Sequence, residues 1–237
     1  NFEKHQDIFY LSMLFVLSII FLFIGIGNYQ LIDVDESRYA VMARDLFNSN
    51  DLNCLMLNGV PFLEKPPLYF WLVGISYKLF NAFNPFTVRF PIALCTMGLV
   101  YATYYVGRQV ISKLYGMLSA VVLLSSVFFL ILSHVAILDM LITIFVALCL
   151  YCGILTHYCE EKNKKYYWFA FYVFMGLGVL SKGILAIALP CTVLFIFNLI
   201  TKTAKDIFKP INMLPGLVVF LLIVTPWHYI MVKDYGY

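Results

Sequence analysis

Residues 115–157 read YGMLSAVVLLSSVFFLILSHVAILDMLITIFVALCLYCGILTH, and this stretch holds one acidic residue, Asp139, and no lysine or arginine. A membrane-spanning helix needs roughly 20 apolar residues to cross about 30 Å of hydrocarbon, and the stretch is about twice that long. A carboxylate in mid-membrane is costly. The stretch therefore predicts two spans, 115–134 and 140–157, joined by a tight hairpin at Asp139.

The composition of the whole chain supports a membrane protein. Of its 237 residues, 62% are hydrophobic and 12% are charged, and the mean hydropathy is +0.88. A soluble domain is about 45–50% apolar and about 25% charged, so a soluble globular domain and a disordered chain are both excluded. The net charge of +3 is too small and scattered for a nucleic-acid partner. The partners expected from composition are membrane lipids.

The same length criterion predicts an all-α polytopic membrane protein with about seven transmembrane helices. The expected spans are 8–27, 89–107, 115–134, 140–157, 167–181, 184–200 and 213–230. The chain starts at Asn1 and ends at Tyr237, directly after an apolar run. We expect residues 1–237 to be a single transmembrane domain fragment, with the C-terminal half of the parent protein absent.

Two cysteines, Cys149 and Cys152, form a CxxC inside the predicted span 140–157. No second pair follows, and no histidine lies at zinc-finger distance. Free cysteine in an apolar run behaves as a small hydrophobic residue. We interpret both as helix-packed thiols.

Basic residues in short connections predict the orientation, because short cytoplasmic connections carry an excess of them. One side has only Lys182 and Lys233. The other side holds the N-terminus with Lys4, Arg108, Lys113, Lys162, Lys164, Lys165, Lys202, Lys205 and Lys209. We therefore expect a cytoplasmic N-terminus, with Asp139, Lys182 and the first long loop outside. An endoplasmic-reticulum protein would show a similar bias.

The first outer loop, residues 28–88, is predicted to contain two juxtamembrane helices. In 36–49 the apolar residues recur at i, i+3, i+4, i+7 and i+8, which is the pattern of an amphipathic helix lying on the membrane surface. A second interfacial helix is expected over 66–80, since proline is tolerated in the first turn. Between them, Asn53 to Pro61 reads as an irregular connection with a turn at Asn58-Gly59.

Acidic and basic residues precede both of these helices. Asp33 with Glu36 three residues later fits a capping box, which leaves Asp35 with no assigned structural role. Lys65 lies just before a helix N-terminus, where anions are favoured, and Pro66 and Pro67 lack N–H groups. A lysine ammonium would supply donors to a phosphate there. The alternative for Lys65 is a solvated or snorkelling side chain.

Two motifs identify a family resemblance. The strings DESRYAVMARDLFNSND (35–51) and NGVPFLEKPPLYFW (58–71) resemble ArnT-like integral-membrane glycosyltransferases of the GT-C group, which also contains the protein O-mannosyltransferases. The family pattern is approximately D-E-x-R-Y-A followed by N-G-x-P-Y-x-E-K-P-P, and Phe62 stands where Tyr is common. LDMLIT (138–143), GLGVLSKG (176–183) and TPWHYI (225–230) look like later family segments.

The resemblance implies a GT-C enzyme that takes a sugar from a polyprenyl-phosphate donor and passes it to an acceptor at the outer face of the membrane. It implies a bacterial inner-membrane location, a periplasmic active site and a lipid A-type acceptor, with another glycan or a protein as alternatives. It also implies residue roles. These are catalytic roles for Asp35 and Asp139, substrate or carrier binding by Glu36, Arg38, Tyr39, Lys65 and Lys182, and a divalent metal ion at Glu64.

Other functions stay open from the sequence. A lipid-linked sugar transporter or flippase would explain the many spans, but it should place its binding groups near the bilayer midplane. Here the chemically useful residues gather on one predicted side. A protein O-mannosyltransferase-like enzyme is the second alternative, although the EKPP sequence at 64–67 favours the ArnT-like branch. A non-catalytic scaffold is the third.

Overall fold

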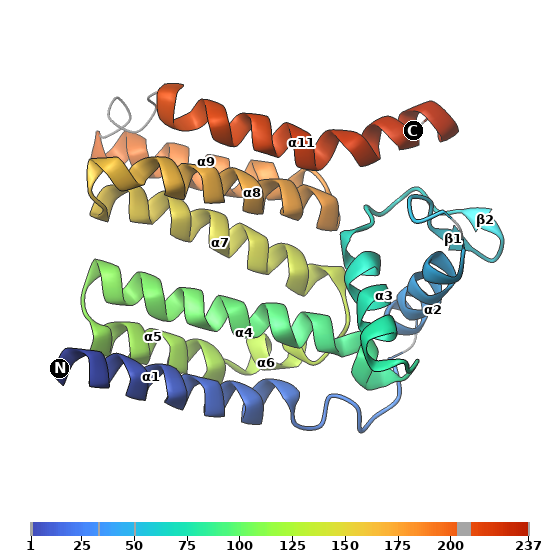
Figure 1. The fold of residues 1–237 in the computed structure, drawn as a ribbon, viewed down its shortest axis with the longest axis horizontal. Helices are drawn as coiled ribbons and strands as arrows, with labels where there is room; N and C mark the ends of the chain where they lie inside the picture. The colour runs from blue at the N-terminus through green and yellow to red at the C-terminus, as the bar shows by residue number, and fades with distance from the viewer. Residues whose placement is uncertain (1, 33, 50, 203–209, 237) are drawn as a thin grey trace. The chain divides into compact units, whose positions relative to one another are not determined.

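The computed structural model of the protein describes residues 2–32, 34–49, 51–202 and 210–236. Helices make up nearly all of its regular structure, and the strands found in these ranges form one short hairpin (Figure 1). The predicted all-α fold is therefore confirmed. The chain divides into two compact units, residues 1–41 with 72–140 and residues 42–71 with 141–237. The single membrane domain expected over the whole chain stays a prediction.

The first unit is built on α1, α4 and α5. α1 (Phe2–Ser18) continues into a π-helical turn, η1 (Ile19–Phe23), and packs against α4 (Pro85–Val110) and α5 (Lys113–Ser125). The side chain of Asn84 accepts from the Thr87 N–H at 3.0 Å, and the Asn84 N–H donates to the Thr87 hydroxyl at 3.2 Å. This reciprocal capping box fixes the start of α4.

Small residues allow α4 and α5 to approach closely, as is common between membrane helices. A Cβ added to Gly107 would lie 2.7 Å from the Cα of Gly116. α5 is followed by α6 (Val127–Ser133), and the two helices meet at a bend of 68°. The bend falls at a serine pair, Ser125 and Ser126, and such pairs are a recognised cause of kinks.

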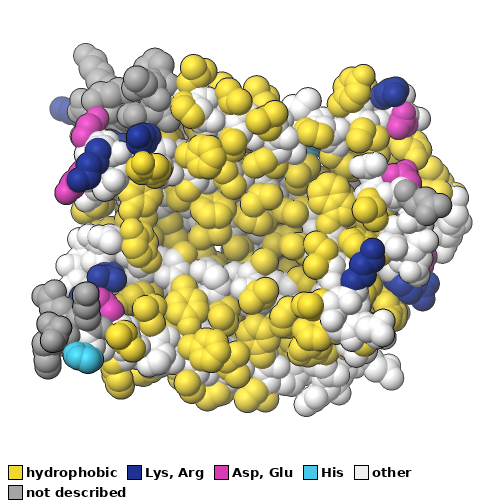
Figure 2. Space-filling view, viewed as in Figure 1, with side chains coloured by type: hydrophobic (Ala, Val, Ile, Leu, Met, Phe, Trp, Pro, Cys, Tyr) yellow, Lys and Arg dark blue, Asp and Glu magenta, His cyan; other side chains and the backbone are white. Residues whose placement is uncertain are grey.

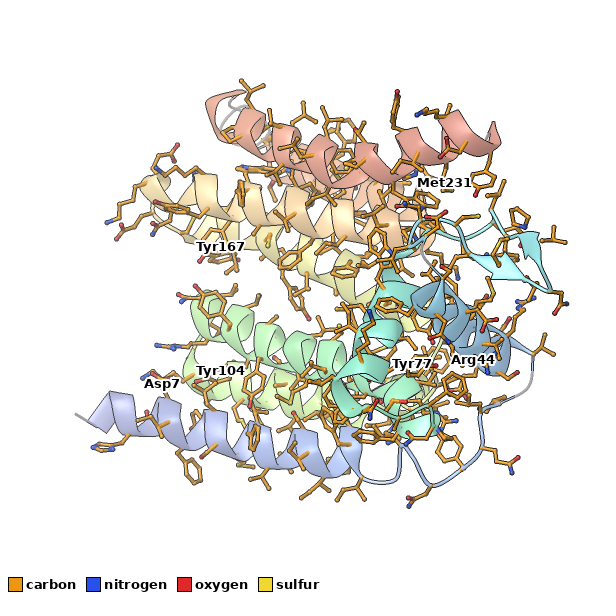
Figure 3. All side chains as sticks on the ribbon, turned by 45° about the vertical axis from the view of Figure 1, so that its right-hand side comes forward. Asp7, Arg44, Tyr77, Tyr104, Tyr167 and Met231 are labelled. Carbon is orange, nitrogen blue, oxygen red and sulfur yellow. The ribbon has the colours of Figure 1, made fainter. Side chains whose placement is uncertain are left out.

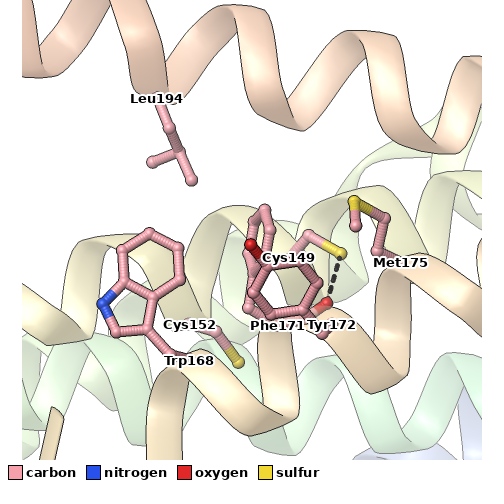
Figure 4. Packing of buried hydrophobic residues seen from close by; sticks show 7 residues of the cluster. All are labelled: Cys149, Cys152, Trp168, Phe171, Tyr172, Met175 and Leu194. Carbon is pink, nitrogen blue, oxygen red and sulfur yellow. Dashed lines mark hydrogen bonds between the residues drawn. The ribbon is translucent and has the colours of Figure 1, made fainter. Parts of the chain in front are cut away.

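The second unit contains the long C-terminal helices. These are most of α7 (Leu138–Tyr158), the short 3₁₀ turn η2 (Glu161–Asn163), α8 (Lys164–Lys182), α9 (Leu185–Thr201) and α11 (Pro210–Tyr235). α8 packs against both α9 and α11. The core between α7, α8 and α9 contains Cys149, Cys152, Trp168, Phe171, Tyr172, Met175 and Leu194 (Figure 4).

The CxxC cysteines belong to this apolar core. Both are free and buried, and the Cys149 thiol lies 3.4 Å from the Phe171 carbonyl oxygen (Figure 4). The interpretation of Cys149 and Cys152 as packed thiols is confirmed. In Figure 2, hydrophobic side chains cover the middle of the helices, and charged side chains gather near helix ends.

The expected spans correspond to helices, but they differ in length. Within the described residues, four helices are long and apolar enough to cross a membrane: His5–Phe23, Pro85–Val110, Leu138–Tyr158 and Met213–Tyr235. The bent pair α5 and α6 would make a fifth. α9 has 17 residues, and the 19-residue α8 does not reach the same hydropathy because lysines lie at both of its ends. The predicted turn before α7 is present, but it lies between Ser133 and Leu138, which places Asp139 in the first helical turn.

The first long connection contains both predicted helices. α2 (Asp35–Asn48) matches the expected 36–49, and α3 (Leu68–Phe80) starts two residues later than expected. The stripe residues Tyr39, Met42, Ala43 and Leu46 are buried, so protein rather than the membrane surface covers this apolar face of α2.

Between these two helices, β1 (Met56–Leu57) pairs with β2 (Val60–Pro61) across Asn58 and Gly59. These two turn residues have φ of 52° and 80°, which is the type I′ geometry that favours Asn-Gly. The predicted turn is therefore confirmed, whereas the short strands that flank it were not expected.

Candidate functional site

The N-terminus of α2 carries the acidic motif. Asp35 and Glu36 lie in its first turn, where carboxylates interact favourably with the helix dipole. Val34, just before the helix, has φ of 63°. A β-branched residue rarely adopts this left-handed conformation, and such strain persists only where the surroundings enforce it. The cap expected at Asp33 lies outside the described residues.

Glu36 forms a buried ion pair with Arg89 of α4, and both side chains are 0% exposed. Arg89 Nε donates to Glu36 Oε1 at 2.8 Å, and a terminal guanidinium nitrogen donates to Oε2 at 2.8 Å. This two-pronged geometry is the strong form of an arginine–carboxylate interaction. The two residues are called here the Glu36–Arg89 clasp.

The remaining hydrogen-bonding capacity of the clasp is used by backbone groups. Glu36 also accepts from the N–H of Ile32 at 2.8 Å and of Ala136 at 2.6 Å. Arg89 also donates to the carbonyls of Ile26, Tyr29 and Gln30 at 2.7–3.0 Å. All five guanidinium N–H groups and about four carboxylate lone-pair positions are therefore satisfied.

The balance of these interactions sets the ionisation of Glu36. Burial alone would raise the pKa of its carboxyl group. The hydrogen bonds from Arg89 and from the Ile32 and Ala136 backbones outweigh burial and hold the pKa below its ordinary value. Glu36 is thus ionised and paired at neutral pH.

Tyr29 adds a second connection across the clasp. The Arg89 guanidinium lies 3.8 Å from the centre of the Tyr29 ring. The Tyr29 hydroxyl donates to the carbonyl of His134 at 2.7 Å. The clasp and Tyr29 together hold the 26–32 connection, α2, α4 and the turn before α7. Charge pairing and backbone hydrogen bonds therefore fix four segments of the first unit at one end of α4.

Asp35 is next to Glu36 in sequence but has the opposite environment. Its side chain is 58% exposed, and it pairs with Arg38, one turn later, at 2.7 Å. The Arg38 guanidinium lies 5.2 Å from the ring centre of the buried Tyr39. Tyr77 of α3, labelled in Figure 3, donates to the Ala40 carbonyl at 3.2 Å and so supports this part of α2. The motif thus presents one solvent-accessible carboxylate beside a buried one.

Asp139 is tied to the same clasp through the backbone. It is exposed in the first turn of α7, three residues after Ala136, whose N–H donates to Glu36. Both carboxylates expected to be catalytic, Asp35 and Asp139, therefore sit on segments that Glu36 holds. Their catalytic roles stay predictions.

In the second unit, Glu64, Lys65 and Lys182 border a separate apolar cluster. Leu63 packs against this cluster two residues before Lys65, and Leu180 belongs to it two residues before Lys182. Lys65 and Lys182 are half-buried, and Glu64 is exposed. Lys182 is the last residue of α8, where Gly183, with φ of 87°, ends the helix.

Two tryptophans of this cluster hold the connection after α2. Trp71 Nε1 donates to the Leu52 carbonyl at 2.8 Å, and Trp227 Nε1 donates to the Asn53 carbonyl at 2.9 Å. Trp71 belongs to α3 and Trp227 to α11. The buried Pro67 accepts from the Trp71 N–H at 2.9 Å, so its carbonyl begins the hydrogen-bond ladder of α3. Lys65 therefore precedes a firmly packed helix start.

Comparison with known proteins identifies the family. Residues 64–230 match the family described as dolichyl-phosphate-mannose-protein mannosyltransferase. The chain belongs to this family. The predicted resemblance to ArnT-like glycosyltransferases of the GT-C group is thereby confirmed at the family level, and similar proteins agree with it.

Relatives of this mannosyltransferase-family chain include an uncharacterized protein of Aquifex aeolicus, 32% identical over 189 residues, which are 79% of this chain and 37% of the relative. An undecaprenyl phosphate-alpha-4-amino-4-deoxy-L-arabinose arabinosyl transferase of Yersinia enterocolitica is 28% identical over 200 residues, which are 81% of this chain and 35% of that relative. ArnT from Cupriavidus metallidurans, crystallised with undecaprenyl phosphate, has the same fold, with a TM-score of 0.86 and 23% sequence identity. The superposition covers 98% of this chain and 42% of the ArnT chain. The chain spans less than half the length of each.

The resemblance places a divalent metal ion at Glu64. Among the described residues, no three His, Cys, Asp or Glu side chains lie close enough together to hold a metal ion. One exposed carboxylate does not make such a site, so the described residues do not form a metal centre by themselves. The metal role of Glu64 stays a prediction, and no chemical step is derived from it.

Arg89 and Tyr29 were not predicted as functional residues. From the sequence, Arg89 is only the first residue of an expected span, and Glu36 is expected to bind substrate. The structure gives Glu36 a positioning role, and substrate binding by Glu36 stays a prediction. One signal was available, because an arginine near the start of an apolar helix needs a partner if it is buried. The sequence does not say which carboxylate supplies that partner.

Proposed function

We propose that the full-length protein transfers a sugar from a polyprenyl-phosphate donor to an acceptor at the membrane surface. The observation that carries this proposal is the Glu36–Arg89 clasp, which holds the DESRYA motif in place and leaves Asp35 exposed beside it. Membership of a lipid-phosphate-sugar transferase family and the fold shared with ArnT support it.

In the proposed reaction, an acceptor oxygen forms a bond to the anomeric carbon of the sugar. The bond from that carbon to the phosphate oxygen breaks, and the phosphate keeps the electron pair. A single displacement of this kind inverts the anomeric configuration. Asp35 serves as the general base for a hydroxyl acceptor, and Asp139 orients the reacting groups. A phosphate acceptor is already ionised and needs positioning more than proton removal.

Lys65 and Lys182 are assigned to the carrier phosphate. Negative charge develops on the phosphate as the sugar leaves, and a fixed ammonium group stabilises that charge. Half-burial strengthens such an interaction, since the local dielectric constant is lower than that of water. Arg38 and Tyr39, which lie beside Asp35 on α2, are assigned to substrate binding.

The donor, acceptor and location follow the ArnT-like branch. We assign an undecaprenyl-phosphate sugar as donor, a lipid A-type glycolipid as acceptor, the bacterial inner membrane as location, and the periplasmic face as the side of the reaction. The description of the matched family favours a second candidate acceptor, a protein hydroxyl that receives mannose. The transferred sugar is either a pentose or a hexose, so donors carrying each kind of sugar are compared in the experiment below.

The decisive experiment uses the full-length protein in lipid nanodiscs. Isotope-labelled undecaprenyl-phosphate sugars are supplied with lipid A or an acceptor protein, and the products are identified by mass spectrometry. Asp35→Asn should lower transfer by about 10²–10⁴-fold, the usual contribution of a general base. Asp45→Asn is the matched control, because Asp45 is another exposed, arginine-paired aspartate of α2. Equal transfer by both variants would remove Asp35 from the mechanism.

The role of Lys65 needs its own measurement. Lys65→Ala should weaken binding of undecaprenyl phosphate to the same nanodiscs, with Lys78→Ala of α3 as the control. Unchanged affinity would exclude the assigned contact. If the wild type moved labelled sugar-lipid between leaflets and formed no new glycosidic bond, the protein would be a transporter instead.

A further inference from the structure

A second charged network lies at the other end of the first unit. Asp7 of α1 accepts from the Tyr104 hydroxyl at 2.9 Å, and Figure 3 shows these two residues between α1 and α4. Asp7 also pairs with Arg108 at 3.2 Å and with Lys113 at 3.0 Å. These side chains are called the Asp7 network. Among the described side chains, the two cations thus share the Asp7 carboxylate.

This network borders an open pocket of about 490 Å³. The pocket is lined by Gln6 and Tyr10 of α1, Arg108 of α4, and Ser112, Lys113 and Leu114 where α5 begins. The side chains of Arg108 and Lys113 are 36% and 22% exposed, so solvent or a ligand reaches them. The lining combines two cationic groups with hydroxyl and amide donors, which suits an oxyanion.

The start of α5 strengthens this preference for an anion. A helix N-terminus carries partial positive charge and is stabilised by an acidic residue or a side-chain cap. Within the described chain, the first turn of α5 has no acidic residue, and the Ser112 hydroxyl makes no capping hydrogen bond. Lys113 instead adds a positive charge at this position. The pocket thus combines two cations with a helix terminus whose first turn contains no acidic residue.

The position of the pocket indicates which anion it meets. Arg108 lies 19 positions after Arg89 in α4, which corresponds to about 28 Å of helix. That length matches the hydrocarbon thickness of a bilayer, so the pocket and the clasp lie near opposite membrane surfaces. Leu114, Leu118 and Val122 follow the pocket along one side of α5 and are exposed at 53%, 51% and 67%. Their i, i+4, i+8 spacing offers an apolar track for acyl chains.

We propose that this pocket binds the phosphate group of an anionic phospholipid in the leaflet opposite the first long loop. Arg108, Lys113 and the α5 N-terminus face the phosphate, Gln6 and Tyr10 bound the headgroup, and the acyl chains lie along Leu114 and Leu118. Basic pockets between membrane helices recognise anionic headgroups in this way. The site is separate from the chemistry assigned to Asp35.

The test compares lipids on the full-length protein by native mass spectrometry and in nanodiscs. Phosphatidylglycerol should bind more tightly than phosphatidylcholine. Arg108→Gln and Lys113→Ala should each weaken the phosphatidylglycerol preference about fivefold, as expected for one basic residue near an anionic surface. Lys162→Ala is the matched control, because Lys162 is an exposed lysine paired with Glu160 in the connection before α8.

A further variant separates lipid binding from folding. Ser112→Asp places a carboxylate at the N-cap of α5, so it should raise the thermal unfolding midpoint or leave it unchanged. The same carboxylate should lower phosphatidylglycerol binding, because it occupies the phosphate position. Lipid binding would then fall without a loss of stability, which a purely structural role of the network does not predict.

Two results would overturn the proposal. Equal binding of the two phospholipids by the wild type would exclude an anionic headgroup site, and an unchanged preference in all three pocket variants would place the site elsewhere. Glycerol 1-phosphate is added in a separate arm. If it binds in phosphatidylcholine nanodiscs as tightly as phosphatidylglycerol does, the pocket takes a soluble phosphate, and the lipid assignment is wrong.

Discussion

The two ends of α4 carry two arginines with opposite environments. Arg89 is buried, and its N–H groups are all used by Glu36 and three backbone carbonyls. Arg108 is partly exposed and shares one aspartate with Lys113 beside an open pocket. The first arrangement uses the donors and acceptors of both side chains within the protein, and the second keeps two cations at the edge of a pocket. The clasp therefore positions protein segments, whereas the Asp7 network is suited to binding.

This contrast distinguishes a buried ion pair that stabilises the fold from a partly exposed ion pair that can bind a ligand. Burying an ion pair gains stability only when every donor and acceptor is satisfied, as in the Glu36–Arg89 clasp. A partly solvated pair contributes little to stability, because water and salt screen it. Its groups nevertheless stay available to an incoming anion. Mutations at the Arg89 end of α4 should therefore mainly reduce stability, whereas mutations at the Arg108 end should mainly reduce anion binding.

Removing Glu36 should have the largest effect. Glu36→Ala leaves the Arg89 charge buried without its counter-ion, which costs about 3–5 kcal/mol of unfolding free energy. The measurement is unfolding of the full-length protein in mixed micelles, followed by far-ultraviolet circular dichroism. Asp7→Ala is the matched variant and should cost far less. Equal losses would mean that burial does not distinguish the two networks.

The same substitution at both arginines sharpens the comparison. Arg89→Lys keeps the charge but offers three donors in place of five, so at least two buried acceptors lose a partner. The expected loss is roughly 2–4 kcal/mol. Arg108→Lys should change stability by no more than about 0.5 kcal/mol, as at most surface positions. A large loss at Arg108 would show that the Asp7 network is also structural.

How far the sequence could predict this contrast depends on the kind of signal. The amphipathic stripe of α2 and the Asn58-Gly59 turn are local patterns, and both were predicted. The Glu36–Arg89 pair joins residues 53 positions apart. Charge and hydropathy show that Arg89 needs a partner but not which carboxylate supplies it. The bend at Ser126 was missed for a related reason, since apolar composition continues unchanged through it.

The close contact between α4 and α5 near Arg108 can be tested by enlarging Gly107. Gly107→Ala places a Cβ 2.7 Å from the Cα of Gly116, so α4 and α5 must move apart. Overpacking of this kind typically costs about 1–3 kcal/mol. Gly98→Ala in the same helix is the control, because an added Cβ there meets no atom within 4 Å. A neutral Gly107→Ala would show that the two helices do not need this close approach to bring Arg108 and Lys113 to Asp7.

Salt should produce the smallest effect and should act on one end only. The Debye length falls from about 10 Å at 0.1 M to about 3 Å at 1 M ionic strength, which screens exposed pairs but hardly reaches buried ones. The stability difference between wild type and Asp7→Asn should therefore shrink as sodium chloride is raised in mixed micelles. The difference between wild type and Glu36→Gln should stay constant, because no ion reaches the clasp. If salt reduced both differences equally, water and ions would have access to Glu36, and its neighbour Asp35 would no longer stand on a rigid support.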